Sequence, residues 1–247
     1  IPSIPKTITI TSNEDKSKTA DLVGGLISIA YFESLMSDTL RATTTFTDTG
    51  TGSSDKIKES ILEGLPIVGQ EKVILKFEDN NKVTIGDKPE LVMYVNKVTP
   101  ISDDTRKTQI RLDLVSAEFI RNEKTRITKR YDGKISDHVK QLLTEGNSIG
   151  LKTKKDIDDI DETLNNYNYI GNNKKPFYII NWLSRKSISA QNQKKGKSAG
   201  YFFYETSKGY HFKSIDSLFA QEQKKSIIFN ETTGIPKGYD LKALQYS

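Results

Sequence analysis

The sequence predicts a mainly β protein with short helices, an α+β fold. Several segments of the first half alternate apolar and polar residues with a period of two, which is the pattern of strands that bury one face. Residues typical of tight turns separate these segments at the spacing of hairpins. After Phe119 the apolar spacing changes to that of short amphipathic helices. We therefore expect a β-barrel or sandwich that is followed by a helix-containing region.

Four segments carry the strand signal. In "TLRATTTFTDT" the apolar Leu40, Ala42 and Phe46 alternate with polar residues, and "EKVILKFED" and "TQIRLDLVS" repeat this alternation. The run "ELVMYVNKV" is more continuously apolar, which predicts a strand covered on both faces. Turns are expected in "EDNNK", "GDKPE" and "SDDTRK". We interpret Gly24 and Gly25 as a bulge or bend in a long strand.

Helix signals follow in the second half. "KISDHVKQLLTEG" predicts a short amphipathic helix with Ser136 as its N-cap and Gly146 at its end. The polar stretch 151–175 is low in large apolar residues and predicts an irregular connection. "PFYIINWLSRKS" predicts a second helix with Pro176 in its first turn. A hairpin and a further short helix, capped by Asp216, complete the expected elements.

The stretch "SAGYFFYETSKGYHFKSIDSLF" is rich in aromatic residues. A platform that stacks a ligand needs rings exposed on one face, whereas here the rings of Tyr201 and Phe203 alternate with those of Phe202 and Tyr204. Burial of a phenylalanine side chain stabilises a fold by about 1.5 to 3 kcal/mol. We therefore predict that most of these rings lie in a core or in a subunit contact.

Composition limits the functional classes. The chain has 247 residues, 35% of them hydrophobic, and no window approaches the roughly 20 apolar residues of a membrane helix. A net charge of +5 would suit a polyanion partner, but the lysines are interleaved with acids, as on an ordinary solvated surface. The absence of cysteine excludes disulfides and thiolate metal sites. The first residues, "IPSIPKTITI", show neither an initiator methionine nor a secretory signal, as expected of a trimmed or processed fragment.

Motifs for catalysis or cofactor binding are not visible in the sequence. The two histidines, His138 and His211, fall in a predicted helix and in an aromatic strand, where we expect a structural role. The acidic run from Asp156 to Glu162 lacks the spacing of an EF-hand, which favours a solvated acidic turn. "GTGSSDK" lacks the remaining residues of either phosphate-binding glycine motif. We expect no catalytic residue, no metal site and no cofactor, although the paired carboxylates of a glycosidase stay open.

Four segments, taken in order, resemble one family: "EGLPIVGQEKVILKF", "LVMYVNKVTPISDDTRKTQIRLDLVSAEFIRNEKTRITKRYDGKISDHVKQLL", "PFYIINWLSRKS" and "GYFFYETSKGYHFKSIDSLF". They resemble the central hub proteins of contractile-tail baseplates in T4-like bacteriophages, relatives of the N-terminal region of type VI secretion spike proteins. The resemblance depends on the order and spacing of the segments rather than on one motif. It implies a tail-tube-like β-barrel, a helical and irregular region, and the start of a second barrel.

The resemblance also implies domains and partners. It places a first tube-like barrel at residues 1–120, a helix-containing connection at 121–199 and a partial second barrel at 200–247. Such hubs are homotrimers that join the tail tube protein to the central spike protein in the virion baseplate. DNA is only a passing cargo, and no membrane is involved. For this chain the resemblance therefore implies a structural symmetry adaptor without enzymatic activity.

The candidate contact loop of the resemblance is "EGLPIVGQE". It gives four expected interface residues: Leu65, Pro66, Ile67 and Val68. The alternative for this loop is a buried hairpin turn. Two other functions also stay open. A carbohydrate- or nucleic-acid-binding β-barrel would stack its ligand on Tyr201 or Tyr210. A hydrolase, for example of the cell wall, would depend on one aspartate or glutamate.

Overall fold

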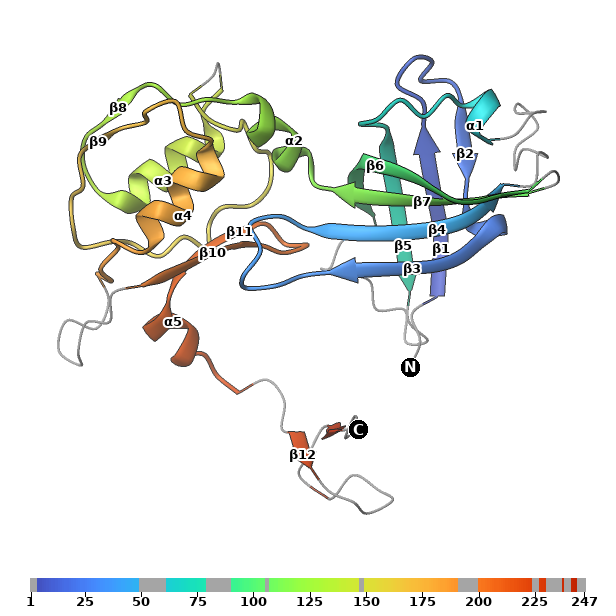
Figure 1. Cartoon of the computed structure of the whole chain (residues 1–247). Coiled ribbons are helices and arrows are strands. Elements are labelled where there is room, and N and C mark those ends of the chain that lie inside the picture. Colours follow the sequence, from blue (N-terminus) through green and yellow to red (C-terminus); the bar gives the residue numbers. More distant parts are fainter. Residues whose placement is uncertain are drawn as a thin grey trace.

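The computed structural model describes residues 4–48, 61–78, 90–104, 107–146, 149–190, 200–223, 227–229, 237 and 241–243. Within these residues the chain forms two units (Figure 1). A curled β-sheet makes the first unit, and short helices with an aromatic hairpin make the second. We call residues 4–115 the barrel unit and residues 117–219 the second unit.

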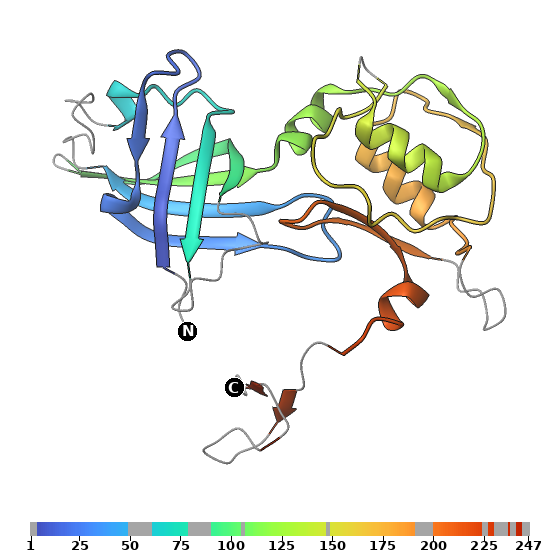
Figure 2. The ribbon, with the colours of Figure 1, turned by 180° about the vertical axis from the view of Figure 1, so that it is seen from behind.

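The barrel unit contains one seven-stranded sheet with the order β2-β1-β5-β6-β7-β4-β3, and every neighbouring pair is antiparallel. The sheet curls on itself and ends in two edge strands, β2 and β3 (Figures 1 and 2). A short helix, α1 (Ile61–Gly64), precedes β5. The strands are β1 (Ile4–Thr11), β2 (Thr19–Asp21), β3 (Leu26–Phe32), β4 (Arg41–Asp48), β5 (Lys72–Glu78), β6 (Leu91–Asp104) and β7 (Lys107–Val115).

Alternating side chains build the core of the barrel unit, as the sequence predicts. In β4, Ala42 and Phe46 are buried, whereas Arg41 is exposed. β5 and β7 bury alternate residues in the same way, so the three predicted half-buried strands are confirmed. The largest fully buried side chains of this core are Phe46, Ile8, Ile10, Leu22, Leu40, Leu65, Leu75, Met93 and Ile110.

β6 differs from its prediction as a strand covered on both faces. Met93 and Val95 are buried, but Val92 and Tyr94 on the other face are only half-buried. The strand belongs to an antiparallel sheet that packs one face on a core, so its second apolar face lies toward the surface. β6 also continues to Asp104, into the predicted turn "SDDTRK". The expected turns "EDNNK" and "GDKPE" lie almost entirely outside the described residues, as does all of "GTGSSDK".

The two glycines predicted to bend a long strand instead form a turn between two strands. A 3₁₀ turn, η1 (Val23–Gly25), connects β2 to β3. A Cβ atom on Gly25 would lie 2.3 Å from the carbonyl oxygen of Thr47 in β4, whereas a Cβ on Gly24 would meet no atom within 4 Å. Gly25 therefore lets the chain pass close to β4 where the sheet curls, and only this position requires glycine.

The second unit surrounds a separate core. Two helices, α3 and α4, pack against each other and share a core with the hairpin β10–β11, and the segment 151–175 wraps around them (Figures 1 and 2). The segment is irregular, as predicted, but it also contributes the buried Leu151 and Ile160 to the core. The elements are α2 (Ala117–Lys124), β8 (Arg130–Tyr131), α3 (Ile135–Thr144), β9 (Tyr169–Ile170), α4 (Pro176–Ser184), β10 (Tyr201–Glu205), β11 (Tyr210–Ser214) and α5 (Ile215–Phe219).

Two of the helices, α3 and α5, begin with different caps from those predicted. α3 starts after Lys134, and its Ser136 backbone N–H donates to the hydroxyl of Thr163 at 3.0 Å. The cap thus comes from the wrapping segment, which sequence patterns around the helix do not reveal. Pro176 is the first residue of α4, as expected. The cap of α5 is Ser214, which accepts from the backbone N–H of Ser217, and Asp216 lies in the first turn instead.

The two cores are distinct clusters, one made by the sheet and one by the helices and the hairpin. The sheet ends at Val115 and α2 begins at Ala117, near the predicted boundary at residue 120. The hairpin β10–β11 shares its core with α3 and α4. The predicted domain limits at residues 120 and 121 and at residues 199 and 200 both stay predictions. A parallel pair of short strands, β12 (Ile227–Phe229) and β13 (Leu241–Ala243), lies away from both cores (Figure 1).

Candidate functional site at the junction of the two units

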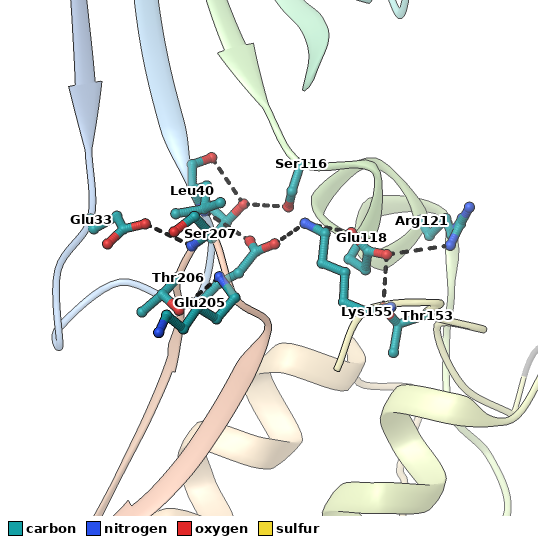
Figure 3. A network of polar contacts seen from close by, with 12 residues as sticks. Glu33, Leu40, Ser116, Glu118, Arg121, Thr153, Lys155, Glu205, Thr206 and Ser207 are labelled. Carbon is teal, nitrogen blue, oxygen red and sulfur yellow. Dashed lines mark hydrogen bonds and ion pairs between the residues drawn. The ribbon is translucent and has the colours of Figure 1, made fainter. Parts of the chain in front are cut away.

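A buried carboxylate connects the barrel unit to the second unit. Glu205 ends β10, and the residue is only 1% exposed. Its Oε2 accepts a hydrogen bond of 2.8 Å from the backbone N–H of Leu40, at the start of β4 (Figure 3). Its own backbone N–H donates to the carbonyl oxygen of Ser37 at 3.3 Å. One residue of the hairpin therefore binds two positions of the loop 33–40 that connects β3 to β4.

The same carboxylate belongs to a chain of charges. The ammonium group of Lys155 contacts Oε1 of Glu205 and lies 3.2 Å from Oε2 of Glu118 in α2 (Figure 3). Oε1 of Glu118 accepts a hydrogen bond of 2.9 Å from the hydroxyl of Thr153 and lies 3.6 Å from Arg121. Two buried carboxylates are thus matched by two cations. Such an arrangement is stable only while every member is present, because an unpaired buried charge is costly.

Burial and the neighbouring charges shift the pKa values of these groups in opposite directions. Burial raises the pKa of Glu205 above its ordinary value, although Lys155 and the Leu40 N–H favour the ionised form. Burial disfavours the charged form of Lys155, but Glu205 and Glu118 outweigh it and raise the pKa of the amine. Lys155 is therefore charged at neutral pH and holds both glutamates. Burial also raises the pKa of Tyr210, whose ring lies beneath the ammonium group of Lys155.

Further hydrogen bonds join the loop 33–40 to the second unit. Oε1 of Glu33 accepts from the backbone N–H of Ser207 in the hairpin turn at 2.6 Å. Asp38 accepts from the side-chain amide of Asn181 in α4 at 3.0 Å. Next to the connection between the units, the hydroxyls of Thr39 and Ser116 are 2.8 Å apart. The junction is therefore polar, and its contacts converge on one short loop.

Beside the hairpin turn, a hydroxyl, an imidazole and a carboxylate lie in a row. Thr206 Oγ1 lies 2.7 Å from His211 Nε2, and His211 Nδ1 lies 2.6 Å from Asp159 Oδ2. This order resembles that of a hydrolase triad, but the donors that would stabilise an oxyanion are already engaged. The Ser207 N–H donates to Glu33, and the Lys208 N–H donates to the Thr206 hydroxyl itself. The geometry favours a structural role for His211, as the sequence predicts.

The surroundings of the other histidine, His138, also indicate a structural role. His138 in α3 is 1% exposed, and its Nε2 lies 3.0 Å from the carbonyl oxygen of Tyr167. Its ring packs edge-on against the stacked rings of Tyr131 and Tyr169. Within the described ranges, the structure contains no group of three or more His, Cys, Asp or Glu residues arranged to hold a metal ion.

The acidic run anchors the hairpin instead of forming a solvated turn. Asp161 is 8% exposed, and its Oδ2 accepts from the backbone N–H of Ser214 at 3.0 Å. Asp159 binds His211 and Lys213 of β11. The prediction of a solvated turn is therefore wrong for the buried Asp161, whereas Asp159 is exposed and still pairs with β11. It overlooked that the polar segment pairs with the outer edge of β11 through backbone hydrogen bonds.

The aromatic hairpin is a core element, as predicted. Tyr201, Phe203, Tyr204, Tyr210 and Phe212 are all at most 7% exposed. Within the hairpin the rings of Phe203 and Tyr210 stack with centroids 5.6 Å apart, and those of Tyr201 and Phe212 stack at 4.7 Å. Rings that are buried against one another offer no face to a base or a sugar. This burial is evidence against the ligand-stacking alternative.

The four predicted interface residues lie in different surroundings. Leu65 is fully buried in the barrel core, and Ile67 packs against that core, with Pro66 half-buried beside them. Val68 alone among the four is largely exposed, at 67%. The loop is a tight turn, because Oε1 of the buried Glu71 accepts from the backbone N–H groups of Val68 and Gly69 at 2.7 and 2.8 Å. The interface stays a prediction, and Val68 is the member that could contact a partner.

The sequence motifs described above do not include Glu118, Lys155 or Glu205. Glu205 closes the aromatic strand "YFFYE", and an acid that follows buried rings is a usable signal for a buried charge. Its partners could not be named, because Lys155 is 50 positions away and Leu40 is 165 positions away.

The edge strand β3 provides a second candidate surface. It ends the sheet, and its side chains are mostly exposed or half-buried. Ile27 and Phe32 are 52% and 55% exposed, and the following Leu35 and Met36 are 47% and 82% exposed. A seven-residue apolar edge without charged side chains is suited to pairing with a further strand. No helix within the described part of the chain is long and apolar enough to cross a bilayer.

No protein-family model and no curated protein matches the chain. Among solved structures, the 43 kDa tail protein of prophage MuSo2 from Shewanella oneidensis matches with a TM-score of 0.54 and 12% identity, over 90% of this chain. The match spans 58% of that protein. An Escherichia coli component of the type VI secretion system, described as similar in structure to the T4 tail proteins gp27 and gp5, matches with a TM-score of 0.39 and 10% identity, over 85% of this chain and 45% of that one.

The mainly β fold with short helices that the sequence predicts is therefore confirmed. The chain shares the fold of the prophage tail protein, which confirms the predicted resemblance at the level of the fold.

Proposed function

We propose that this chain is a structural component of a phage tail that works by assembling with further copies of itself. The observation that carries the proposal is the apolar edge strand β3, in a fold shared with a prophage tail protein. Ile27 and Phe32 are more than half exposed on this edge, where a neighbouring copy could add strands to the sheet. The rings of the hairpin are buried in a core and offer no face to a ligand, which supports a structural role.

The finer proposal is a hub of the contractile-tail baseplate in the virion. In this role the chain acts as a symmetry adaptor between the tail tube and the central spike, as a homotrimer in its full-length form. A heterologous interface that closes after a fixed number of copies gives a ring rather than a fibre. DNA would pass through the ring only as cargo. The support for this proposal is the order of the four segments that resemble the hub family.

The experiment measures assembly of the purified chain at micromolar concentration, by light scattering and by negative-stain electron microscopy. We expect small rings for the unmodified chain. Ile27→Lys with Phe32→Lys should give monomers, because lysine on an edge strand opposes pairing. Ile170→Lys is the matched control, since Ile170 is 56% exposed but lies in β9 of the second unit. Dispersed monomers of the unmodified chain would refute assembly, and rings without threefold or sixfold symmetry would refute the hub.

A further inference from the structure

The junction between the two units has the composition of a movable joint. The two cores are separate clusters, and the chain crosses from one unit to the other at residues 115–117. Beside this crossing, the loop 33–40 contacts the second unit, and Figure 3 draws the bonds of its Glu33 to Ser207 and of its Leu40 to Glu205. Small polar interfaces between units of one chain permit relative motion by default, unlike large apolar ones. The contacts across the junction therefore determine how freely the two units move.

Four hydrogen bonds from the loop reach the second unit beyond the crossing. Glu33 accepts from the Ser207 N–H, Ser37 accepts from the Glu205 N–H, and Asp38 accepts from Asn181. The fourth runs from the Leu40 N–H to the Glu205 carboxylate at 2.8 Å. An exposed bond between Lys124 and Gln70 also crosses, but solvent competes with it. Glu205 alone takes part in two of the four bonds.

Glu205 differs from the other carboxylates of the junction, Glu33 and Asp38, in its burial and in its ion pair with Lys155. Its side chain is 0% exposed, whereas Glu33 is exposed. Lys155 holds the carboxylate from the second unit, so the carboxylate is already in position when the loop docks on it. A hydrogen bond from a backbone N–H to a desolvated, charged acceptor is among the strong ones. The loop is thus bound to a group that belongs rigidly to the other unit.

We propose that Glu205 is a latch that fixes the angle between the barrel unit and the second unit, and that the chain bends at residues 115–117 when the latch is open. Hinges are a few residues at the ends of elements, and this crossing joins the end of β7 to the start of α2. The hydroxyls of Thr39 and Ser116 meet next to this crossing, so a rotation there would change their contact. The latch belongs to the single chain and does not depend on the proposed assembly.

The experiment measures the distance between the units by double electron–electron resonance. The chain has no cysteine, so Lys16→Cys and Lys140→Cys place one spin label on each unit without further changes. Both positions are exposed, one between β1 and β2 and the other on α3. The labels are introduced in the background of the β3 edge variant Ile27→Lys with Phe32→Lys, so that distances between copies do not contribute. We expect one narrow distance peak with Glu205 present.

Glu205→Ala should lose the narrow peak and give a broad distribution. Glu205→Gln should give a distance distribution of intermediate width, because its amide oxygen can still accept from the Leu40 N–H but cannot form an ion pair with Lys155. Hydrogen exchange of the Leu40 amide should follow the same order. Glu145→Gln is the control, since Glu145 pairs with Lys129 within the second unit and should leave the peak unchanged.

A narrow, unshifted peak for folded Glu205→Ala would overturn the proposal. If that variant does not fold, Glu205→Gln carries the test, and an unchanged narrow peak for it would also overturn the latch. Glu33→Ala with Asn181→Ala removes two other bonds of the loop and leaves Glu205 in place, so it should broaden the peak less. If this pair broadens the peak as much as Glu205→Gln does, the angle is fixed by the other bonds and the latch is refuted. Failure of ring assembly would not affect these outcomes, because every measurement is made on monomers.

Discussion

The backbone N–H of Leu40 and the carboxylate of Glu205 meet at 2.8 Å across 165 positions of sequence. Leu40 is part of the barrel core, and Glu205 directly follows the buried rings of β10. Each partner is therefore fixed by its own unit, and the bond reports how the two units are placed. Its strength can be measured through the stability of the chain.

Glu205→Ala should lower the free energy of unfolding by about 3 to 5 kcal/mol, because Lys155 and the Leu40 N–H would lose a buried partner. Glu205→Gln should cost less, since it keeps one acceptor. Urea denaturation at neutral pH measures both. Glu14→Ala, at an exposed position in the loop after β1, is the control and should change stability by less than about 0.5 kcal/mol. If Glu205→Ala and Glu14→Ala are equally stable, the charge network around Glu205 does not stabilise the fold.

Phe203→Ala should destabilise the chain by about 3 to 5 kcal/mol, because truncation of a buried ring leaves a cavity. Phe203 is 4% exposed and contacts the rings of Phe177 and Tyr210. Phe219→Ala is the matched control, since Phe219 ends α5 and is 86% exposed. Thermal unfolding compares the two variants. Unchanged thermal stability of Phe203→Ala would remove this ring from the core.

Acidification should weaken the anchor of the hairpin at Asp159. Partial burial opposes its ionisation, but hydrogen bonds from Lys213 and His211 outweigh burial and lower the pKa of this carboxyl below its ordinary value. A lowered pKa in the folded state stabilises the fold above the unfolded value, near 3.9, and this contribution is lost as the pH falls through the folded pKa. The free energy of unfolding should therefore fall below about pH 4, and Asp159→Asn should reduce this slope.

Asp158→Asn is the control for the pH experiment, because it changes an exposed carboxyl next to Asp159. Its pH dependence should match that of the unmodified chain. If the unfolding free energy of Asp159→Asn depends on pH with the same slope as that of the unmodified chain, the pairing with Lys213 and His211 contributes nothing to stability.

The fold could be predicted where the signal is local. Alternation located β4, β5 and β7, and Pro176 marked the start of α4. The N-terminus of α3 was placed wrongly because its cap, Thr163, comes from a distant segment. The junction was missed for the same reason: Glu118 and Lys155 look like ordinary surface charges until the chain is folded, and the partners of Glu205 lie 50 and 165 positions away. Buried ion pairs depend on long-range geometry, and single-sequence patterns do not contain it.

A matched pair of glycines provides the sharpest test of how the sheet curls. Gly25→Ala would place a Cβ 2.3 Å from the carbonyl oxygen of Thr47, so β4 or η1 must shift, at a cost of about 1 to 3 kcal/mol. Gly24→Ala meets nothing within 4 Å and should be neutral or stabilising, because alanine restricts the unfolded chain more than glycine does. Chemical denaturation compares the two variants, which differ by one position in the same turn. Equal stabilities would mean that η1 does not approach β4 closely, and the curled sheet would then need another explanation.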